Sequence, residues 1–174
     1  MKISQIMKSD VEMCGPDDNL AAAASRMWDC DIGCLPVVGA AGEVVGMVTD
    51  RDICMSALTR GQSLREIPVS VAMTKEVLSC APDATLIDAE EVMRAGQVRR
   101  LPVIDSDGCL VGVVSLNDLA RLAEHDIGRE NPDLSAQEIT ATLAAICAPR
   151  APTPASSREA EEGRGSASRI EAGT

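Results

Sequence analysis

The chain has 174 residues, 45% of them hydrophobic, which is enough to bury the core of one compact domain or of two small similar halves. The net charge at pH 7 is −11 and the one aromatic residue is Trp28; both argue against a nucleic-acid partner, because phosphates bind basic surfaces and single-stranded bases stack on aromatic rings. No run of about 20 apolar residues could cross a bilayer, and the first ten residues lack the apolar region of a signal peptide, so we expect a cytoplasmic protein with no membrane partner.

A tandem repeat organises the chain. Residues 7–54 align with residues 73–120 at an offset of 66 without a gap, and 16 of the 48 aligned pairs are identical. The identical pairs include two glycines, two prolines and two aspartates, which compositional bias alone would not keep in register. The chain therefore contains two copies of one structural unit.

In chain order, each copy predicts the elements β-α-β-β-α. Apolar residues at Leu20, Ala23, Ala24 and Met27 have the spacing of an amphipathic helix, and the glycine-bearing turns between the later strands are typical of hairpins. Neither copy alone can bury both faces of its small sheet, so we expect an α/β (α+β) fold in which two copies pack through their sheets about a pseudo-twofold axis. The first copy's expected elements are an extended segment at 11–14, a helix from Leu20, strands at 34–39 and 44–49 and a helix at 51–60. The equivalent elements of the second copy begin with an extended segment at 77–80 and end with a helix at 116–125.

A further helix is expected at residues 131–148. Ser135 and Glu138 predict a capping box at its start, and Ile139, Leu143 and Ile146 form an apolar stripe that we expect to pack against the same protein. From residue 149 to 174 the composition is Pro, Ala, Ser, Gly and charge with one aliphatic residue, which predicts a disordered tail.

A hydroxyl residue and an aspartate recur three positions apart, as Thr49 and Asp52 and again as Ser115 and Asp118. Each pair matches a capping box, in which the hydroxyl accepts from a free N–H group at the start of a helix and the acid reaches back to the cap. This structural interpretation needs no ligand.

The same arrangement suits a nucleotide. A strand that ends in a hydroxyl and enters a helix leaves N–H groups for a phosphate, and a carboxylate one turn later could accept both hydroxyls of a ribose. Gly46 and Gly112, just before the end of each strand, would let a flat ring approach the backbone closely. Both interpretations stay open at this point.

The segments IGCLPVVGAAGEVVGMVTDRDI and VRRLPVIDSDGCLVGVVSLNDL carry a family resemblance. Together with the preceding Pro-Asp turns and helices, they make residues 3 to 125 similar to a tandem pair of cystathionine-β-synthase-type (CBS) domains, a Bateman module. The resemblance implies a first repeat at residues 1–62 and a second repeat at residues 63–125.

Members of this family bind adenosine compounds in clefts between the repeats, so the resemblance implies a regulatory module for AMP, ADP, ATP, NAD or S-adenosylmethionine. It implies a homodimer that modulates an unidentified protein partner, with no catalytic cofactor. We expect no enzyme, since the sequence offers no nucleophile and base pair. The nucleotide-binding residues implied by position are Val11, Leu35, Pro36, Val37, Thr49, Arg51, Asp52, Val77, Arg99, Arg100, Leu101, Pro102, Val103, Ser115 and Asp118.

The two copies differ in charge. Arg99 and Arg100 stand where the first copy has Gly33 and Cys34, which slightly favours the second cleft for phosphate. Solvated charges at the end of a strand are an equally good interpretation of the two arginines.

The cysteines offer a competing function. Cys30 and Cys34 with the single His125 give a weak zinc or redox pattern, because no second cysteine pair accompanies them and no basic residue adjoins them in sequence. The alternative hypothesis is a ligand-free interaction module that responds to redox state or metal through its cysteines. Without paired cysteine spacing, reduced thiols packed as small apolar groups are the default expectation.

Overall fold

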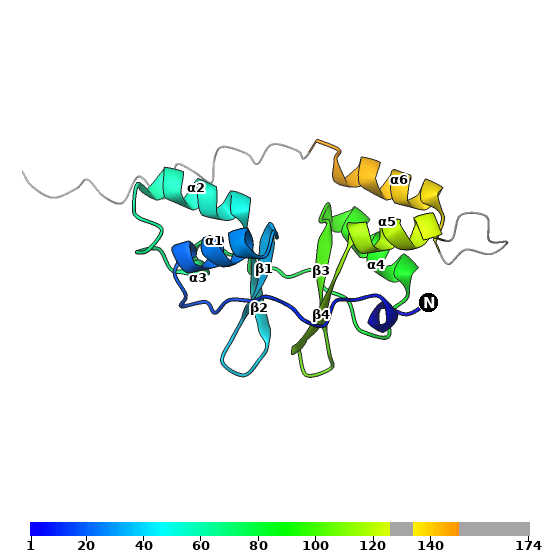
Figure 1. Cartoon of the computed structure of the whole chain (residues 1–174), viewed down its shortest axis with the longest axis horizontal. Coiled ribbons are helices and arrows are strands. Elements are labelled where there is room, and N and C mark those ends of the chain that lie inside the picture. The colour runs from blue at the N-terminus through cyan, green and yellow to red at the C-terminus, as the bar shows by residue number, and fades with distance from the viewer. Residues whose placement is uncertain (126–133, 150–174) are drawn as a thin grey trace, which may run out of the picture.

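The computed structural model describes residues 1–125 and 134–149. Within them it contains six α-helices, one short 3-10 helix and two small antiparallel sheets, which confirms the mixed helix and strand fold (Figure 1). Apart from Pro149, the predicted tail lies outside the described residues, as do residues 131–133 of the predicted C-terminal helix. The elements are η1 (Ile3–Gln5), α1 (Leu20–Asp29), β1 (Cys34–Val38), β2 (Val44–Thr49), α2 (Asp50–Arg60), α3 (Val69–Ala72), α4 (Leu86–Gly96), β3 (Arg100–Ile104), β4 (Leu110–Ser115), α5 (Leu116–His125) and α6 (Ala136–Ile146).

Each repeat forms one hairpin, β1 with β2 and β3 with β4, and the two hairpins have the same register and the same irregularity near the turn. They lie side by side at the centre of the molecule, with the helices on the outer sides (Figure 1). The two turns are joined by hydrogen bonds from Val44 N–H to the Gly108 carbonyl (3.1 Å) and from Leu110 N–H to the Gly42 carbonyl (3.3 Å). The repeats therefore pack through their sheets, as predicted.

The extended segments expected before the first helix of each repeat are shorter than predicted. Each contributes a single parallel bridge, Cys14 to Val37 and Cys80 to Val103, in place of a strand. A proline follows two residues after each cysteine, and proline has no N–H group to continue a ladder, so the chain turns away there.

Two separate hydrophobic cores hold the molecule together, and each takes in a segment from the start of the other repeat. Ile3 belongs to the core of the second repeat, and its N–H donates to the Ala84 carbonyl. Ile67 and Val69, near the start of the second repeat, belong to the core of the first, and the Ile67 carbonyl accepts from Leu20 N–H. The two halves are thus interlocked by an exchange of segments.

The exchanged segments also explain the glycines of the repeated motif. A Cβ atom on Gly112 would lie 2.7 Å from Met7 Sδ and 3.0 Å from the Lys8 carbonyl oxygen. The equivalent Gly46 meets Met73 Sδ at 2.7 Å. The close approach that these glycines permit is filled by the protein's own methionine segments, not by a ligand ring as expected.

Helix α6 packs against α4 and α5 and starts with the predicted capping box of Ser135 and Glu138. Its buried side differs from the prediction, because Thr142 is fully buried while Leu143 is 46% exposed. The buried carboxylate of Glu90 bonds the Thr142 hydroxyl, and this polar contact turns residue 142 toward the core. Ile139 and Ile146 pack against the core as expected.

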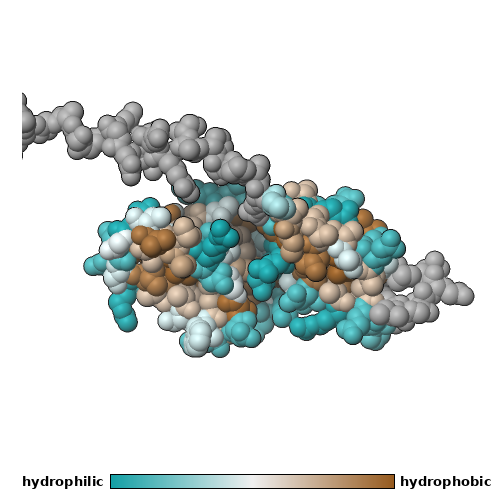
Figure 2. All heavy atoms as spheres, turned by 90° about the horizontal axis from the view of Figure 1, so that it is seen from above, coloured by the Kyte–Doolittle hydropathy of each residue, from teal (hydrophilic) through white to brown (hydrophobic). Residues whose placement is uncertain are grey.

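Apolar side chains also reach the surface. Figure 2 looks onto the edge that carries α2 and α6, and it shows hydrophobic patches on both halves with hydrophilic side chains between them. None of the described helices is long and apolar enough to span a membrane.

Candidate functional site

The repeated motif lies where a strand passes directly into a helix. Thr49 ends β2 and is the N-cap of α2, and Ser115 ends β4 immediately before α5. Asp52 and Asp118 follow one turn inside the helices, next to the positive ends of the helix dipoles. Local sequence alone thus places a hydroxyl, the start of a helix and a carboxylate together, once in each repeat. In the first repeat the opening N–H groups of the helix are already bonded, since those of Asp50 and Arg51 donate to the Gly33 carbonyl (3.2 Å) and to Asp50 Oδ1 (2.7 Å).

Both aspartates complete capping boxes. Asp52 Oδ2 accepts from Thr49 N–H (3.0 Å) and from Thr49 Oγ1 (2.6 Å), while Thr49 Oγ1 accepts from Asp52 N–H (3.2 Å). Asp118 and Ser115 repeat the pattern, with the Ser115 N–H bond at 2.9 Å. Among the described residues no hydrogen bond reaches Oδ1 of either aspartate. One carboxylate oxygen caps the helix and the other keeps its hydrogen-bonding capacity, so the two interpretations of the motif are compatible.

A basic side chain from the second repeat reaches the first motif. A Cβ on Gly33 would lie 3.2 Å from Asp50 Oδ2 and 4.0 Å from Arg100 Nη1. Burial raises the pKa of the Cys34 thiol, and the charge and hydrogen bond of Arg100 act in the opposite direction. Arg100 therefore lies against the start of β1 and the start of α2.

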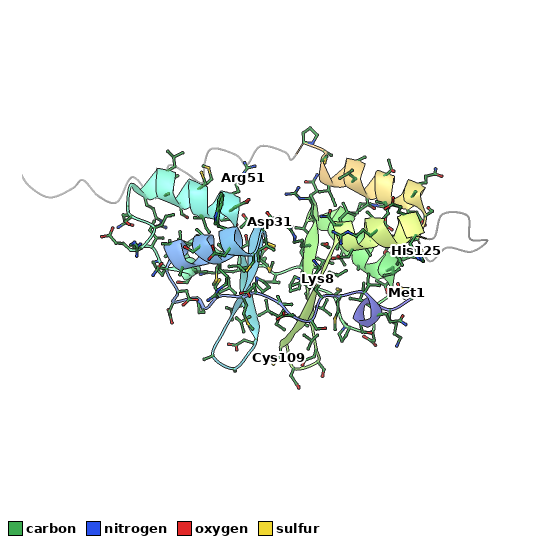
Figure 3. All side chains as sticks on the ribbon, viewed as in Figure 1. Met1, Lys8, Asp31, Arg51, Cys109 and His125 are labelled. Atoms are coloured by element: carbon green, nitrogen blue, oxygen red, sulfur yellow. The ribbon has the colours of Figure 1, made fainter. Side chains whose placement is uncertain are left out.

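Two other arginines named from the sequence are exposed. Arg51 lies at the end of α2 that faces the second repeat, with Asp31 on the same side of the first repeat (Figure 3). Arg99 is exposed beside half-buried Arg100. The space between the repeats thus has basic groups from both of them.

The apolar residues proposed as walls divide into two groups. Val11 and Val77 are half-buried, whereas the side chains of six others are buried inside the two halves. The carbonyls of Pro36 and Pro102 already accept hydrogen bonds from Cys14 N–H and Cys80 N–H. In this conformation the buried residues offer a ligand little beyond neighbouring backbone. They are Leu35, Pro36, Val37, Leu101, Pro102 and Val103.

All seven cysteines are free, including exposed Cys30 and half-buried Cys34. In the described part of the chain, no group of three or more His, Cys, Asp or Glu side chains is arranged to hold a metal ion. Burial raises the pKa of the equivalent thiols Cys14 and Cys80 to about 11, so both are protonated at neutral pH. This pair is structural.

The described part of the structure has two further hollows, one of which includes Asp50 of the first motif. One of about 570 Å³ borders the start of the second repeat's core, between residues 79–83 and 104–106. The other, of about 360 Å³, lies between the end of α1 and the start of α2. No sequence pattern predicted it, and Trp28, which is 87% exposed, lies at its rim. It is lined by Ala24, Met27, Trp28, Asp31, Ile32, Gly33, Asp50 and Ile53.

Comparison with known proteins agrees with the repeat. The family model described as CBS domain matches twice, at residues 3–58 and 64–125. The CBS domain-containing protein YhcV of Bacillus subtilis is 35% identical over 139 residues, which are 79% of this chain and 97% of YhcV.

Two solved structures show the same arrangement. The crystal structure of Hypoxic Response Protein I, with two coordinated zinc ions, has a TM-score of 0.64 and 34% identity over 70% of this chain and 98% of that one. The structure of CBSX2 in complex with AMP has a TM-score of 0.64 and 25% identity over 71% of this chain and 96% of that one. The protein described here belongs to the CBS-domain family and carries two copies of the domain.

Proposed function

We propose that the protein is a regulatory module that binds an adenosine-containing ligand between its two repeats and thereby alters its association with a protein partner. The observation that carries the proposal is the duplicated motif, in which each aspartate caps a helix with one oxygen and keeps the other open. A similar CBS-domain structure, CBSX2, is described in complex with AMP. The proposal includes AMP, ADP, ATP, NAD and S-adenosylmethionine, and it assigns no catalytic step.

In this proposal each group of the motif meets one part of the ligand. The ribose hydroxyls donate to the open Oδ1 of Asp52 or Asp118, and charge-assisted bonds of this kind contribute about 1.5–3 kcal/mol each. The phosphates lie near the cap hydroxyl at the positive end of the helix dipole, which favours negative charge. The base occupies the space next to half-buried Val11 or Val77.

Charge separates the two clefts. The chain carries −11, so anionic ligands depend on local basic groups to offset the general repulsion. Because Arg100 lies against Gly33 and Cys34, and Arg51 adjoins Asp52, we place the stronger phosphate site at the first motif. This reverses the slight preference for the second cleft that the sequence suggested.

The location and assembly belong to the same proposal. Seven free thiols suit a reducing compartment, and adenosine compounds are cytoplasmic metabolites, so we place the protein in the cytoplasm. We also propose that it acts as a homodimer.

A thermal melt with and without each ligand tests the function. A ligand present at about 100 times its Kd should add roughly 2.7 kcal/mol to the free energy of unfolding. We expect a rise in melting temperature with at least one of AMP, ATP, NAD and S-adenosylmethionine, and no rise with adenine-free ribose 5-phosphate. Melting curves that none of these compounds moves would contradict the proposal.

A zinc-responsive module is the second candidate, because a structure 34% identical to this chain contains two zinc ions. The candidate ligands are Cys30 and Cys34, and within the described residues neither His125 nor any other third ligand joins them in a metal-holding group. A zinc-dependent rise in melting temperature that the double variant Cys30→Ser, Cys34→Ser abolishes would favour this function. The same variant should leave a response to AMP intact.

A further inference from the structure

The 360 Å³ hollow on the first repeat has an occupied counterpart on the second. Shifting its lining residues by 66 positions leads to α4, to the residues after it and to the start of α5. Ala24 and Trp28 become Glu90 and Arg94, and Asp31 becomes Gln97. The pseudo-symmetry therefore indicates what kind of element fits the groove between α1 and α2, defined here by those lining residues.

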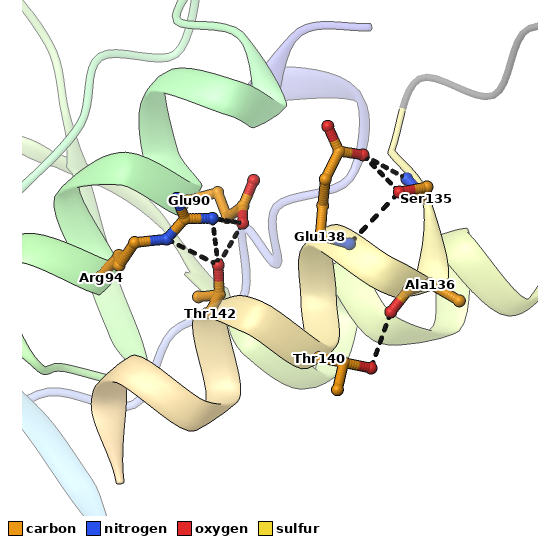
Figure 4. Close-up of polar contacts among 7 residues, drawn as sticks. All are labelled: Glu90, Arg94, Ser135, Ala136, Glu138, Thr140 and Thr142. Atoms are coloured by element: carbon orange, nitrogen blue, oxygen red, sulfur yellow. Dashed lines mark hydrogen bonds and ion pairs between the residues drawn. The ribbon is translucent and has the colours of Figure 1, made fainter. Parts of the chain in front are cut away.

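Helix α6 fills the counterpart. The guanidinium of Arg94 donates to Thr142 Oγ1 (3.0 Å) and to Glu90 Oε1 (2.6 Å), and the Thr142 hydroxyl also bonds Glu90 (Figure 4). Gln97 Nε2 donates to the carbonyls of Ala145 (3.0 Å) and Ala148 (3.1 Å) at the end of the helix. A helix thus occupies on the second repeat the site that is open on the first.

The groove on the first repeat is more apolar than its counterpart. Ala24 and Trp28 replace the charged Glu90 and Arg94, and Trp28 is 87% exposed. An exposed tryptophan beside a helix-sized hollow is typical of an interface anchor. Its occupant needs an apolar face without acidic side chains, because Asp31 and Asp50 also line the groove.

Helix α6 has such a face on its exposed side. Five residues without charge form one continuous arc there, while Ile139 and Ile146 on the other side pack against the core. The exposed residues are Ala136, Thr140, Leu143, Ala144 and Cys147. Each copy of the chain thus offers both a vacant helix-accepting groove and a helix face with nothing of the described chain against it.

We propose that two copies of the chain associate by placing the exposed face of α6 of each copy in the α1–α2 groove of the other. A two-fold axis satisfies both contacts at once, because residue i of one copy meets residue j of its partner and the reverse. Helices α2 and α6 lie along the same edge of the molecule, and apolar patches are visible on both halves of that edge (Figures 1 and 2).

Charge favours this pairing over groove against groove. Asp29, Asp31 and Asp50 lie at or beside the groove and are all exposed, so pairing two grooves would bring like charges together. The exposed arc of α6 carries no charge. The inference specifies the proposed homodimer. Because the groove includes Gly33 and Asp50, which lie close to Arg100, it borders the proposed phosphate site, so a titration with AMP reports nucleotide binding separately from the sedimentation of the variants.

Sedimentation velocity of the full chain over a concentration series tests the pairing. We expect a species of twice the 18.2 kDa chain mass. Trp28→Glu in the groove and Ala144→Glu on α6 should each shift the protein to monomer, because each variant damages both contacts. Val71→Glu, at an exposed apolar residue of α3 outside both surfaces, should stay dimeric.

The variants also distinguish other arrangements. Each must keep the wild-type circular dichroism spectrum at low temperature, because loss of the dimer by itself lowers the melting temperature. Leu143→Glu serves as a second α6 variant should Ala144→Glu fail to fold. An equimolar mixture of Trp28→Glu and Ala144→Glu should form mixed dimers at higher concentration than the wild type, since one of the two contacts is intact. Three results would overturn the proposal. They are a monomeric wild type, a monomeric Trp28→Glu variant beside a dimeric Ala144→Glu variant, and a mixture of the two variants that forms no mixed dimers.

Discussion

Asp52 and Asp118 each complete the capping box of a helix, whether or not a ligand is bound. One oxygen of each carboxylate accepts the cap N–H and hydroxyl groups, and that arrangement holds the other oxygen in a fixed direction. A residue locked in this way loses little side-chain freedom when a ribose binds. The capping box is therefore a reason to expect binding competence at these positions.

The chain provides a matched control for the motif. Thr85 and Asp88 form a capping box of the same geometry at the start of α4, outside the repeated motif. We expect Thr85→Ala and Thr49→Ala to lower the free energy of unfolding by a similar amount, about 0.5–2 kcal/mol. Chemical denaturation measures that loss, and ligand affinity should fall only in Thr49→Ala. An equal loss of affinity in both variants would assign the effect to folding.

Thiol reactivity should separate the seven cysteines. Burial raises the pKa of Cys14 and Cys80 from 9.0 to about 11, so almost no thiolate is present at pH 8. Exposed Cys30, Cys54 and Cys147 should be alkylated by iodoacetamide first. At pH 8, mass spectrometry of peptides should find Cys14 and Cys80 unmodified until denaturant is added. Without denaturant, their labelling should increase as the pH rises toward 11. Rapid labelling of Cys14 in the native protein at pH 8 would contradict the burial seen here.

At the scale of elements, α6 is held by hydrogen bonds of Thr142 to the ion pair of Arg94 and Glu90 on α4, in which the carboxylate is buried and the guanidinium is partly exposed. Glu90 is 3% exposed and pairs with Arg94, whereas the pair of Arg26 and Glu12 lies at 3.6 Å on the surface. We expect Arg94→Ala to cost about 1–3 kcal/mol, because it leaves a buried carboxylate poorly paired. Arg26→Ala should cost less, at most about 1 kcal/mol for the ion pair itself. Denaturant titrations of the two variants compare these losses, and equal losses would show that α6 does not depend on this contact.

The exchanged segments make a prediction about the second repeat. Ile3 is fully buried in the core that Leu101, Val114 and Leu119 form, although it lies almost 100 residues earlier in the chain. Ile3→Ala should destabilise the protein by about 2–5 kcal/mol, as for other buried large-to-small substitutions. Hydrogen exchange should locate the lost protection in α4, β3 and β4. Lost protection confined to α1 and β1 would be incompatible with the exchange.

The helices and hairpins were predictable because periodicity, capping residues and turn glycines are local signals. Helix α5 spans the predicted residues 116–125, and α6 follows the predicted cap at Ser135. The exchange of segments could not be predicted, since it depends on which of two similar cores a methionine-led segment joins. The burial of Thr142 likewise depends on Glu90, which is 52 positions away.

The candidate site was only partly predictable. Spacing correctly placed Thr49 and Asp52 at a strand end and helix start, and the same held for Ser115 and Asp118. The contact of Arg100 with the first repeat could not be read from the second repeat's own sequence, because it crosses the pseudo-twofold axis. The role of these residues in binding stays a proposal.

At the scale of the whole molecule, the two similar halves differ most in the charged groups that they bring to the space between them and in whether a further helix covers their outer helices. The second repeat supplies Arg100 to the space between the halves and has its outer helices covered by α6. The first repeat supplies Arg51 to the same space, has no described helix equivalent to α6, and exposes Trp28. The two halves of the duplication thus differ in which outer surfaces are covered and which are exposed.

Calorimetric titration of AMP and ATP into the wild type, Asp52→Asn and Asp118→Asn tests nucleotide binding at the motif most directly. Losing a charge-assisted bond to ribose should weaken affinity about tenfold or more, since each 1.4 kcal/mol is a factor of ten. We predict that the wild type binds, that Asp52→Asn shows this loss most clearly for ATP, and that its melting temperature falls only slightly. Absence of binding heat in the wild type, or unchanged affinity in both variants, would contradict the proposal and leave the two carboxylates as helix caps.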